Sequence, residues 1–335
     1  MMKTSVIGGG TWGTALAIVL AVNGHEVTIW SALERERKAL TEAPDQIRNL
    51  PGARLPKSVR ITGELNEACS NRDLIVFAVA SPYVRETAKK CRPYIKEGQI
   101  IVNVAKGIEE GTLYTLSAIL EEELPGADIA VMSGPSHAEE VSRGIPTTCV
   151  AGARTKKTAA FIQDAFMNEF FRIYTSPDVI GIELGGSLKN VIALAAGIAD
   201  GLGFGDNTKA ALMTRGIAEI GRLGIKMGGK IETFSGLSGV GDLFVTCTSH
   251  HSRNRNAGYL IGKGYTMEEA MKEVNQVVEG VYSARAALAL ARKYNVAMPI
   301  VEQINLVLFE GKSAAAAVSD LLLRDKTQEH DSLEW

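Results

Sequence analysis

The sequence predicts an α/β domain built on an open parallel sheet, followed by an all-helical domain. The first half alternates short β-rich runs with amphipathic segments, which is the pattern of a parallel sheet covered by helices. From about Pro177 onward the β-rich runs stop, and segments rich in Ala, Leu, Gly and Met, such as Ile182 to Ala199 and Ala210 to Leu223, have helical length and spacing. We therefore expect one domain over residues 1–178 and a second over residues 179–335.

The sheet domain begins with a strand, a helix and a second strand. We predict a strand from Lys3 to Ile7, a helix from Thr14 to Asn23 and a strand from Val27 to Trp30. Gly24 ends the helix, because glycine tolerates positive φ. Five later runs are short, rich in Val, Ile or aromatic residues and bounded by turn formers: Leu74 to Val79, Ile100 to Val104, Ile129 to Met132, Thr147 to Ala151 and Phe171 to Tyr174.

The composition describes a globular protein with balanced charge. The 335 residues are 46% hydrophobic and 22% charged, and 36 Lys and Arg face 38 Asp and Glu, so the formal net charge is −2. This balance argues against nucleic-acid binding as the main activity, while a few local cations suffice for one small anion. No uncharged apolar run approaches the ~18 residues of a membrane span, so we expect a cytoplasmic protein with no integral membrane segment. The four cysteines are far apart in the sequence, which favours reduced thiols over disulfides or a zinc site.

A glycine cluster follows the first predicted strand. Gly8, Gly10 and Gly13 form a GxGxxG pattern inside the strand–helix–strand unit. Gly8 permits a tight turn, Gly10 lets the backbone approach a pyrophosphate, and Gly13 allows the helix to pack closely on the strand. The unpaired N–H groups at the start of the helix suit the anion. The pattern predicts a dinucleotide-binding site, and a purely structural turn is the alternative.

The end of the second strand lacks the acid that usually completes such a site. An Asp or Glu there hydrogen-bonds the ribose 2′-hydroxyl of NAD and repels the 2′-phosphate of NADP. This chain has Ser31 and Ala32 instead, with Arg35 and Arg37 just beyond. We therefore expect NADP(H) to be accepted and leave open whether it is preferred. The alternative is that both arginines lie on a solvated helix face, as alternating charges often do.

Two polar segments follow predicted strands at the edge where open α/β sheets bind ligands. Lys106 and Gly107 come after the strand that ends at Val104, and Gly134-Pro135-Ser136-His137 comes after the strand that ends at Met132. Both segments could reach the reactive end of a bound cofactor. An ordinary surface lysine and a Gly-Pro turn are the alternatives.

Lys189 lies in an unusually apolar helix. From Leu188 to Ala199 the only polar residues are Lys189 and Asn190, so this helix is expected to be buried on several sides. Desolvation would lower the pKa of Lys189 toward the range useful for proton transfer. A lysine whose ammonium extends from a helix end to solvent is the alternative, and spacing does not distinguish the two. Asp242 could orient the ammonium, although an aspartate in such a glycine-rich stretch is often only a helix cap.

Hydrogen-bond donors concentrate between Ser249 and Asn256, just before a predicted helix. Arginine is a charged fork, and serine and asparagine add neutral donors, so this segment suits one phosphate. A solvated loop is the alternative. His250 and His251 are adjacent and lack the i, i+4 spacing with which helical histidines share a metal, so we expect no metal site.

Taken together, these segments resemble the bacterial NAD(P)-dependent glycerol-3-phosphate dehydrogenase family over nearly the whole chain. Seven segments carry the resemblance in the right order: Gly8 to Gly13, Ala105 to Gly107, Ser133 to Pro135, Leu184 to Ala193, Gly239 to Leu243, Ser252 to Arg255 and Gln276 to Gly280. The resemblance implies a Rossmann-type domain followed by an all-α domain of the 6-phosphogluconate dehydrogenase C-terminal type. It also implies the interconversion of dihydroxyacetone phosphate and sn-glycerol 3-phosphate with NAD(H) or NADP(H), in support of phospholipid synthesis.

The resemblance further implies roles for individual residues. Lys189 would be the catalytic proton donor or acceptor, and Lys106 would contact both substrate and nicotinamide. Asp242 would belong to the catalytic group, and it would hold the substrate together with both lysines. The other residues implied to hold the substrate are Gly134, Ser136, Ser252, Arg253 and Asn254. Those implied to touch the cofactor, besides the glycine loop and Lys106, are Thr11, Trp12, Ala138, Arg253, Val277 and Glu279.

The chain departs from the family pattern at two positions. His137 stands where the family commonly has Phe, so this side chain either packs or forms hydrogen bonds. Ala32 stands where the family often has His or Arg, so contact with a 2′-phosphate would pass to Arg35 or be weak.

Two other functions remain open at this point. A dehydrogenase with the same two-domain plan could act on a hydroxy acid or sugar acid, and it would select a carboxylate over a phosphate. A dinucleotide-binding redox sensor would bind NADPH without needing Lys106 or Lys189. The apolar, glycine-rich helical half is compatible with a homodimer.

Overall fold

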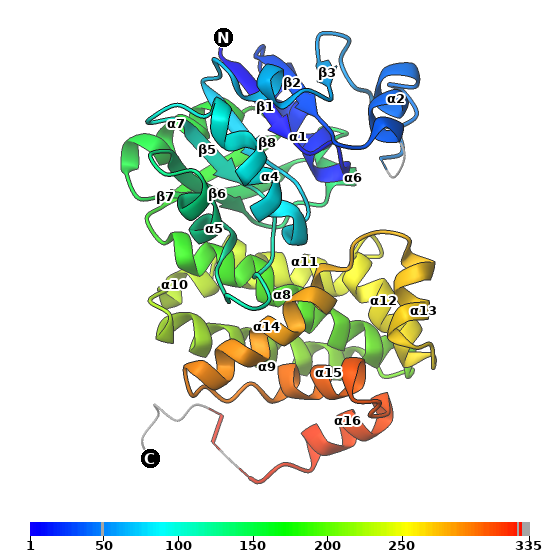
Figure 1. Cartoon of the computed structure of the whole chain (residues 1–335). Coiled ribbons are helices and arrows are strands. Elements are labelled where there is room, and N and C mark those ends of the chain that lie inside the picture. Colours follow the sequence, from blue (N-terminus) through cyan, green and yellow to red (C-terminus); the bar gives the residue numbers. More distant parts are fainter. Residues whose placement is uncertain (48–49, 327, 330–335) are drawn as a thin grey trace.

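The computed structural model describes residues 1–47, 50–326 and 328–329, and it has a sheet domain above a helical domain in the view of Figure 1. The predicted fold class is confirmed. The strands are β1 (Lys3–Ile7), β2 (Glu26–Trp30), β3 (Arg60–Thr62), β4 (Leu74–Phe77), β5 (Ile100–Asn103), β6 (Asp128–Ser133), β7 (Thr147–Ala153) and β8 (Phe171–Ser176). They form one sheet in the order β3-β2-β1-β4-β5-β6-β7-β8.

Helices cover both faces of this sheet. The helical segments of the sheet domain are α1 (Thr11–Val22), α2 (Glu34–Glu42), α3 (Leu65–Cys69), η1 (Ser81–Tyr83), α4 (Val84–Cys91), η2 (Arg92–Tyr94), α5 (Leu116–Glu123), α6 (Ala138–Val141) and α7 (Lys156–Phe166). In β4, Leu74 and Val76 enter the core beneath α1, while Ile75 and Phe77 enter the core beneath α4 and α5. This two-sided burial explains why the strand is a continuous apolar run.

Three details of the sheet domain differ from the prediction. The sheet is not wholly parallel, because β7 runs antiparallel to β6, and β8 then runs parallel to β7. The short strand β3 was not predicted; its three residues pair with Thr28 to Trp30 at the sheet edge. Helix α1 begins at Thr11, directly after Gly10, so the first turn contains residues predicted to be loop.

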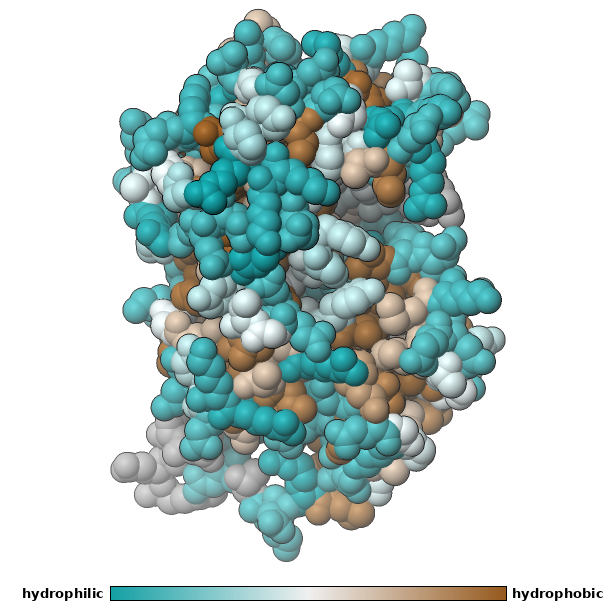
Figure 2. All heavy atoms as spheres, viewed as in Figure 1, coloured by the Kyte–Doolittle hydropathy of each residue, from teal (hydrophilic) through white to brown (hydrophobic). Residues whose placement is uncertain are grey.

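The second domain contains only helical segments and connecting turns among the described residues after Ser176. These are α8 (Val179–Gly201), α9 (Asp206–Lys226), α10 (Ile231–Phe234), the π-helical turn η3 (Leu237–Gly241), α11 (Asp242–Thr248), α12 (Arg253–Gly262), α13 (Met267–Val274), α14 (Glu279–Lys293), α15 (Pro299–Phe309) and α16 (Ala314–Leu322). Hydrophilic side chains cover much of the face shown in Figure 2, and hydrophobic patches gather on this lower half.

Helix α8 is the centre of the helical domain. It is long and apolar enough by composition to cross a membrane, but 89% of that window is buried inside the protein, as expected of a core helix. Helices α9, α11, α12 and α14 all pack against it. The four cysteines, Cys69, Cys91, Cys149 and Cys247, are buried and free, in keeping with the reduced thiols predicted.

Glycines allow α12 to lie against the backbone of α8. A Cβ on Gly197 would lie 2.0 Å from the carbonyl oxygen of Arg255, and a Cβ on Gly258 would lie 2.2 Å from that of Leu194. Real side chains do not tolerate such distances to backbone atoms. The close approach brings the first residues of α12 beside the middle of α8, where Lys189 and Asn190 lie.

We expect Gly197→Ala to lower the free energy of unfolding by at least about 1–3 kcal/mol, because the added methyl group forces the two helices apart. Urea unfolding followed by circular dichroism measures this. The matched control is Gly221→Ala in α9, where the nearest atom to a Cβ is 3.9 Å away and the higher helix propensity of alanine should leave stability equal or raised. Equal midpoints for Gly197→Ala and the wild type would show that the α8–α12 contact does not depend on glycine.

Candidate active site

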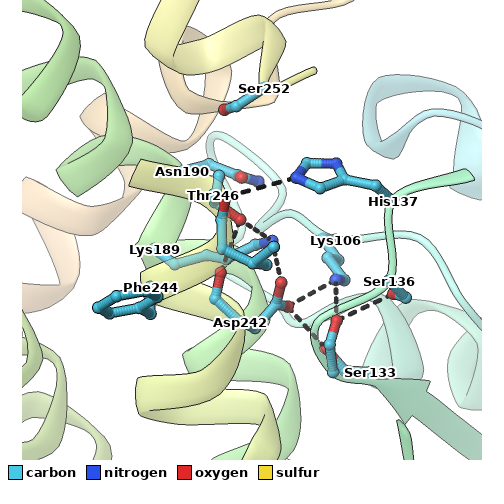
Figure 3. Close-up of polar contacts among 12 residues, drawn as sticks. Lys106, Ser133, Ser136, His137, Lys189, Asn190, Asp242, Phe244, Thr246 and Ser252 are labelled. Atoms are coloured by element: carbon cyan, nitrogen blue, oxygen red, sulfur yellow. Dashed lines mark hydrogen bonds and ion pairs between the residues drawn. The ribbon is translucent and has the colours of Figure 1, made fainter. Parts of the chain in front are cut away.

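The carboxylate of Asp242 joins two lysines that come from different domains (Figure 3). Lys106 follows β5 and donates from Nζ to Oδ2 of Asp242 at 2.5 Å. Lys189 lies in α8 and donates from Nζ to Oδ1 of the same carboxylate. Asp242 itself begins α11 and is 1% exposed. The structure therefore brings together the three residues that the sequence singled out as catalytic.

Burial governs the electrostatics of this cluster. Lys189 is 6% exposed, so it is the buried lysine and not the solvent-reaching alternative. Desolvation lowers the pKa of Lys189 to about 7, against the opposing effect of Asp242. Burial by itself would raise the pKa of Asp242, but the two adjacent ammonium groups outweigh it and lower that pKa below its ordinary value. The cluster thus holds an ionised carboxylate beside a lysine that can exchange a proton near neutral pH.

Each ammonium group keeps one hydrogen without a partner among the residues that the structure describes. Nζ of Lys189 also donates to Oγ1 of Thr246 at 2.7 Å, and Nζ of Lys106 also donates to the carbonyl oxygen of Gly134 at 3.2 Å. An ammonium group has three donors, so each lysine has one left for a ligand. Figure 3 shows the two amino groups on adjacent sides of the Asp242 carboxylate.

Thr246 and Ser133 complete the cluster, and neither was predicted as a site residue. Thr246 is one helical turn after Asp242 and donates to its backbone carbonyl at 2.6 Å. The i, i+4 spacing was the available signal, but it is informative only once residues 242–248 are known to be helical. Ser133 ends β6 and donates from Oγ to Oδ2 of Asp242 at 3.3 Å.

The glycine loop has the geometry that its pattern predicts. Gly8 has φ of +127°, and a Cβ there would lie 2.7 Å from the carbonyl oxygen of Ala78. A Cβ on Gly13 would lie 2.1 Å from the carbonyl oxygen of Gly8, so α1 packs tightly on β1. Gly10, in contrast, has open space around it, and no side chain caps the start of α1. This end of α1, at Thr11 and Trp12, is therefore accessible to a pyrophosphate.

A cavity of about 500 Å³ lies between the domains at the start of α12. Its lining includes Pro51 and Glu139 from the sheet domain and His250, Arg253 and Gln276 from the helical domain. A ligand in this cavity could therefore contact both the sheet domain and the helical domain.

Arg253 lines this cavity on the helical side, and Ser252 precedes it in the sequence and is buried. Arg255 is paired with Asp200 at 2.6 Å, whereas the guanidinium of Arg253 forms no ion pair within the part of the chain that the structure describes. Ser252 caps α12 by accepting from the backbone N–H of Arg255, so its hydroxyl hydrogen is left to donate. Of the segment predicted to supply donors, residues 249–252 form the turn before α12 and residues 253–256 form its first turn.

Asn254 is held by other parts of the protein. Its side chain donates to Oδ1 of Asn190 at 3.0 Å and accepts from the backbone N–H of Gly280 at 2.8 Å. Only one amide hydrogen remains for a ligand. Asn254 thereby fixes α12 to α8 and to the start of α14. Glu279 is the first residue of α14, and Val277 precedes it by two positions.

Glu279 ties the helical domain to the sheet domain. Its carboxylate accepts hydrogen bonds from the backbone N–H of Ser81, at 3.1 Å, and from the Ser81 hydroxyl. Burial raises the pKa of Glu279. A contact with a cofactor would therefore require Glu279 to share or exchange the Ser81 interaction.

The segment after β6 turns sharply beside Lys106. Gly134 has φ of +148°, and a Cβ there would lie 2.9 Å from Cα of Cys149, while Ser136 donates to the carbonyl oxygen of Gly134 at 2.9 Å. Ala138 begins α6 and is buried. The ring of His137 packs 5.9 Å from that of His251, and burial lowers the pKa of His137 to about 4. Nε2 of the neutral ring also lies 3.4 Å from the carbonyl oxygen of Val245 in α11, so His137 both packs and forms a hydrogen bond across the domain boundary.

No group of three or more His, Cys, Asp or Glu that could hold a metal ion occurs among residues 1–47, 50–326 and 328–329.

The glycine loop and the Lys106–Asp242–Lys189 cluster lie at the same carboxyl edge of β1, β4 and β5, which run parallel side by side. This arrangement is typical of a nicotinamide-dependent oxidoreductase, and the fold and site assign the chain to that class. Models of NAD-dependent glycerol-3-phosphate dehydrogenase match residues 3–159 with their N-terminal part and residues 178–319 with their C-terminal part. The chain belongs to this family.

Individual relatives agree with the family match. The chain is 64% identical over 335 residues to the glycerol-3-phosphate dehydrogenase [NAD(P)+] of Agathobacter rectalis, with all of both chains covered. It is 50% identical to the enzyme of that name from Bacillus subtilis, over 99% of this chain and 97% of the relative. The crystal structure of glycerol-3-phosphate dehydrogenase from Coxiella burnetii superposes with a TM-score of 0.93 at 36% identity, covering 96% of this chain and 99% of that one.

The fold alone is shared more widely. A structure of D-mandelate dehydrogenase has a TM-score of 0.62 at 15% identity, covering 96% of this chain and all of that one. A hydroxy-acid dehydrogenase can therefore have the same two-domain plan, and the residues of the site carry the distinction.

We expect Asp242→Asn to lower the free energy of unfolding by about 3 kcal/mol, because it removes the counter-charge that keeps the buried Lys189 protonated, so that folding must either bury an unpaired ammonium or release its proton. Denaturant unfolding at pH 6, where Lys189 is mostly protonated, measures the loss. Adding Lys189→Met to Asp242→Asn should restore part of the stability, since no buried amine then has to stay charged without a partner or lose its proton. If the losses in stability of the two single variants simply added in the double variant, this electrostatic account would be contradicted.

Proposed function

We propose that the chain catalyses the reversible reduction of dihydroxyacetone phosphate to sn-glycerol 3-phosphate with a reduced nicotinamide cofactor. The observation that carries this proposal is the Lys106–Asp242–Lys189 cluster at the carboxyl edge of the sheet. Family membership supplies the substrate class, and the cluster supplies groups that match the reaction. A ketone that becomes an alcohol needs one proton at its oxygen and stabilisation of the charge that develops there.

The residues at the sheet edge fit a dinucleotide. The open backbone at Gly10 and the uncapped start of α1 suit a pyrophosphate, with Thr11 and Trp12 in the first turn. When bound, the reduced nicotinamide supplies the hydride that C2 of the ketone requires. The other residues that we propose to contact the cofactor are Lys106, Ala138, Arg253, Val277, Glu279 and, near the adenosine ribose, Arg35.

Lys189 is the proposed proton donor. Its pKa of about 7 means that both protonation states are populated near neutral pH, so it can give a proton to the carbonyl oxygen and take one back in the reverse direction. Thr246 and Asp242 occupy two of its hydrogens and thereby orient the third. Asp242 also stabilises the ammonium form, which otherwise would be lost on burial.

Lys106 is proposed to stabilise the developing alkoxide. Its side chain is 18% exposed, so its ammonium can contact both the buried cluster and a ligand between the domains. The contact with the carbonyl oxygen of Gly134 fixes its direction relative to the turn after β6.

Arg253 and Ser252 are proposed to bind the substrate phosphate. A guanidinium is a charged fork that matches phosphate oxygens, and the start of α12 adds a favourable helix dipole. Gly134, Ser136 and Asn254 would complete the substrate pocket. When the phosphate is held, the small ketone is fixed in front of the lysines. Binding energy from the phosphate, which does not react, is thereby used to orient the carbonyl group.

The cellular setting follows the family resemblance. We propose that the product feeds phospholipid synthesis, that the protein acts in the cytoplasm and that it forms a homodimer.

We expect Lys189→Ala to lower the turnover number for dihydroxyacetone phosphate by at least about 10²–10⁴-fold, because a positioned proton donor is lost. Binding of NADH should remain within a few-fold of the wild type. In the wild-type enzyme kcat/KM for reduction should be level below pH 7 and fall above it, since protonated Lys189 is the active form and its pKa is about 7. Oxidation of sn-glycerol 3-phosphate should show the opposite slope, because it needs the neutral amine.

Absorbance of the nicotinamide follows both reactions between pH 5.5 and 9. Lys272→Ala, which removes an exposed lysine from α13, is the matched control and should leave turnover unchanged. Near-normal turnover in Lys189→Ala would remove Lys189 from its proposed role.

We expect Arg253→Ala to raise KM for dihydroxyacetone phosphate by about 30–150-fold, which corresponds to one charged hydrogen-bonding contact worth about 2–3 kcal/mol. Steady-state kinetics measures this beside Arg292→Ala, which removes an exposed arginine from the last turn of α14 and should have no effect. An unchanged KM would mean that the phosphate binds elsewhere. Faster turnover of a 2-oxo acid than of dihydroxyacetone phosphate in the wild type would favour the hydroxy-acid dehydrogenase instead.

A further inference from the structure

A carboxylate lies beside the glycine loop although the end of β2 has no acidic residue. Ser31 follows β2 and donates from Oγ to Oε2 of Glu36 at 2.6 Å. The same oxygen would lie 3.4 Å from a Cβ on Gly9, the second residue of the glycine loop. Glu36 belongs to α2, which lies beside β2 and β3 at one edge of the sheet (Figure 1). The structure therefore brings an acid to the strand end from the following helix.

The local backbone holds Glu36 in this position. Ser31 also accepts a hydrogen bond from the backbone N–H of Leu33 at 3.1 Å, so one hydroxyl fixes both the turn and the carboxylate. Leu40, one helical turn after Glu36, is 4% exposed and belongs to the core, which turns this face of α2 inward. Glu34 and Lys38 pair with each other on the outer face. Of the two glutamates at the start of α2, Glu36 therefore faces the end of β2, and Glu34 faces away from it.

The arginines of α2 are arranged differently from the expectation. Arg37 donates from Nη1 to the backbone carbonyl of Ser31 at 2.7 Å, and its guanidinium carbon would lie 3.0 Å from a Cβ on Gly63, which follows β3. Arg37 therefore occupies the β3 side of Ser31, while Glu36 occupies the glycine-loop side. Arg35 is exposed and forms no hydrogen bond or ion pair among the described residues.

We propose that Glu36 is the acceptor for the ribose 2′-hydroxyl of the cofactor and that the chain consequently prefers NADH to NADPH. This inference rests on the dinucleotide site proposed above. An acid at the end of β2 normally performs this function, and a carboxylate that reaches the same end from α2 repels a 2′-phosphate by the same mechanism. The absence of an acid at positions 31 and 32 therefore does not favour NADP(H).

Arg37 moderates the preference and does not reverse it. Its guanidinium would attract a 2′-phosphate, but one of its donors is already bound to the Ser31 carbonyl, and it lies on the far side of Ser31 from the glycine loop. A phosphate that reached Arg37 would have to pass the carboxylate or displace it. NADPH should accordingly bind, but less tightly than NADH.

Calorimetric titration of the purified full-length protein with NADH and with NADPH tests the proposal without relying on turnover. The wild type should bind NADH at least about tenfold more tightly. Glu36→Gln should reduce the ratio of the two affinities at least about tenfold, mainly through tighter NADPH binding, because the amide no longer repels the phosphate. Glu34→Gln removes the same charge from the outer face of the same helix and should leave the ratio within about twofold. Arg37→Gln should weaken NADPH binding more than NADH binding.

Three results would overturn the proposal: NADPH binding as tight as NADH binding in the wild type, equal shifts in Glu36→Gln and Glu34→Gln, or no binding of either cofactor. Reduction of dihydroxyacetone phosphate, assayed in parallel with both cofactors, separates this inference from the proposed function. Equal rates and affinities with both cofactors would leave the dehydrogenase in place and remove the role of Glu36. A cofactor ratio that depends on Glu36 without reduction of the ketone would remove the proposed function and leave the role of Glu36.

Discussion

The rest of the site depends on one buried carboxylate, that of Asp242, which binds a lysine from each domain. A carboxylate this deeply buried remains ionised only when cations are close, so the two domains must hold their lysines at hydrogen-bonding distance. Other carboxylates of the helical domain stabilise the same interface. Glu183 in α8 accepts from the backbone N–H of Ser117 at 2.8 Å, and Glu279 accepts from Ser81. At three points of the domain interface a carboxylate of the helical domain thus receives donors from the sheet domain, and the contact between Asp242 and Lys106 is one of them.

Small residues in α8 make these distances possible. A Cβ on Gly185 would lie 2.4 Å from the carbonyl oxygen of Ser238 in η3, and one on Gly186 would lie 2.7 Å from Oγ of Ser133. The first half of α8 can therefore lie directly against the segment that leads into Asp242 and against the end of β6. Further along, Gly197 admits α12 in the same way. An apolar helix with so many glycines has low intrinsic helix propensity, so packing on all sides must stabilise it.

Much of the fold could be predicted because the local pattern of apolar residues differs between buried strands and helices. Strands buried on both faces are continuous apolar runs, and the loss of such runs after Pro177 marks the change to helices. The direction of β7 could not be predicted in this way. The connection from β6 contains only the four-residue helix α6, too short to cover the sheet as a parallel crossover helix does, so the chain returns antiparallel. Strand β3 has three residues, which is too few for periodicity to reveal.

Site residues could be predicted from the sequence only where the local pattern itself indicates the chemistry of the side chain. A lysine in an apolar helix is either buried or solvent-reaching, and the choice depends on which elements cover α8, a tertiary property that spacing cannot supply. The same holds at the end of β2. The alternating charges of α2 are consistent with a solvated face, yet Leu40 sets the rotation of the helix, and that rotation directs Glu36 inward and Glu34 outward. Glu36 is five residues beyond Ser31 in the sequence, but its carboxylate lies at the end of β2, where an acid was expected. Helix α2, and not the strand itself, places it there.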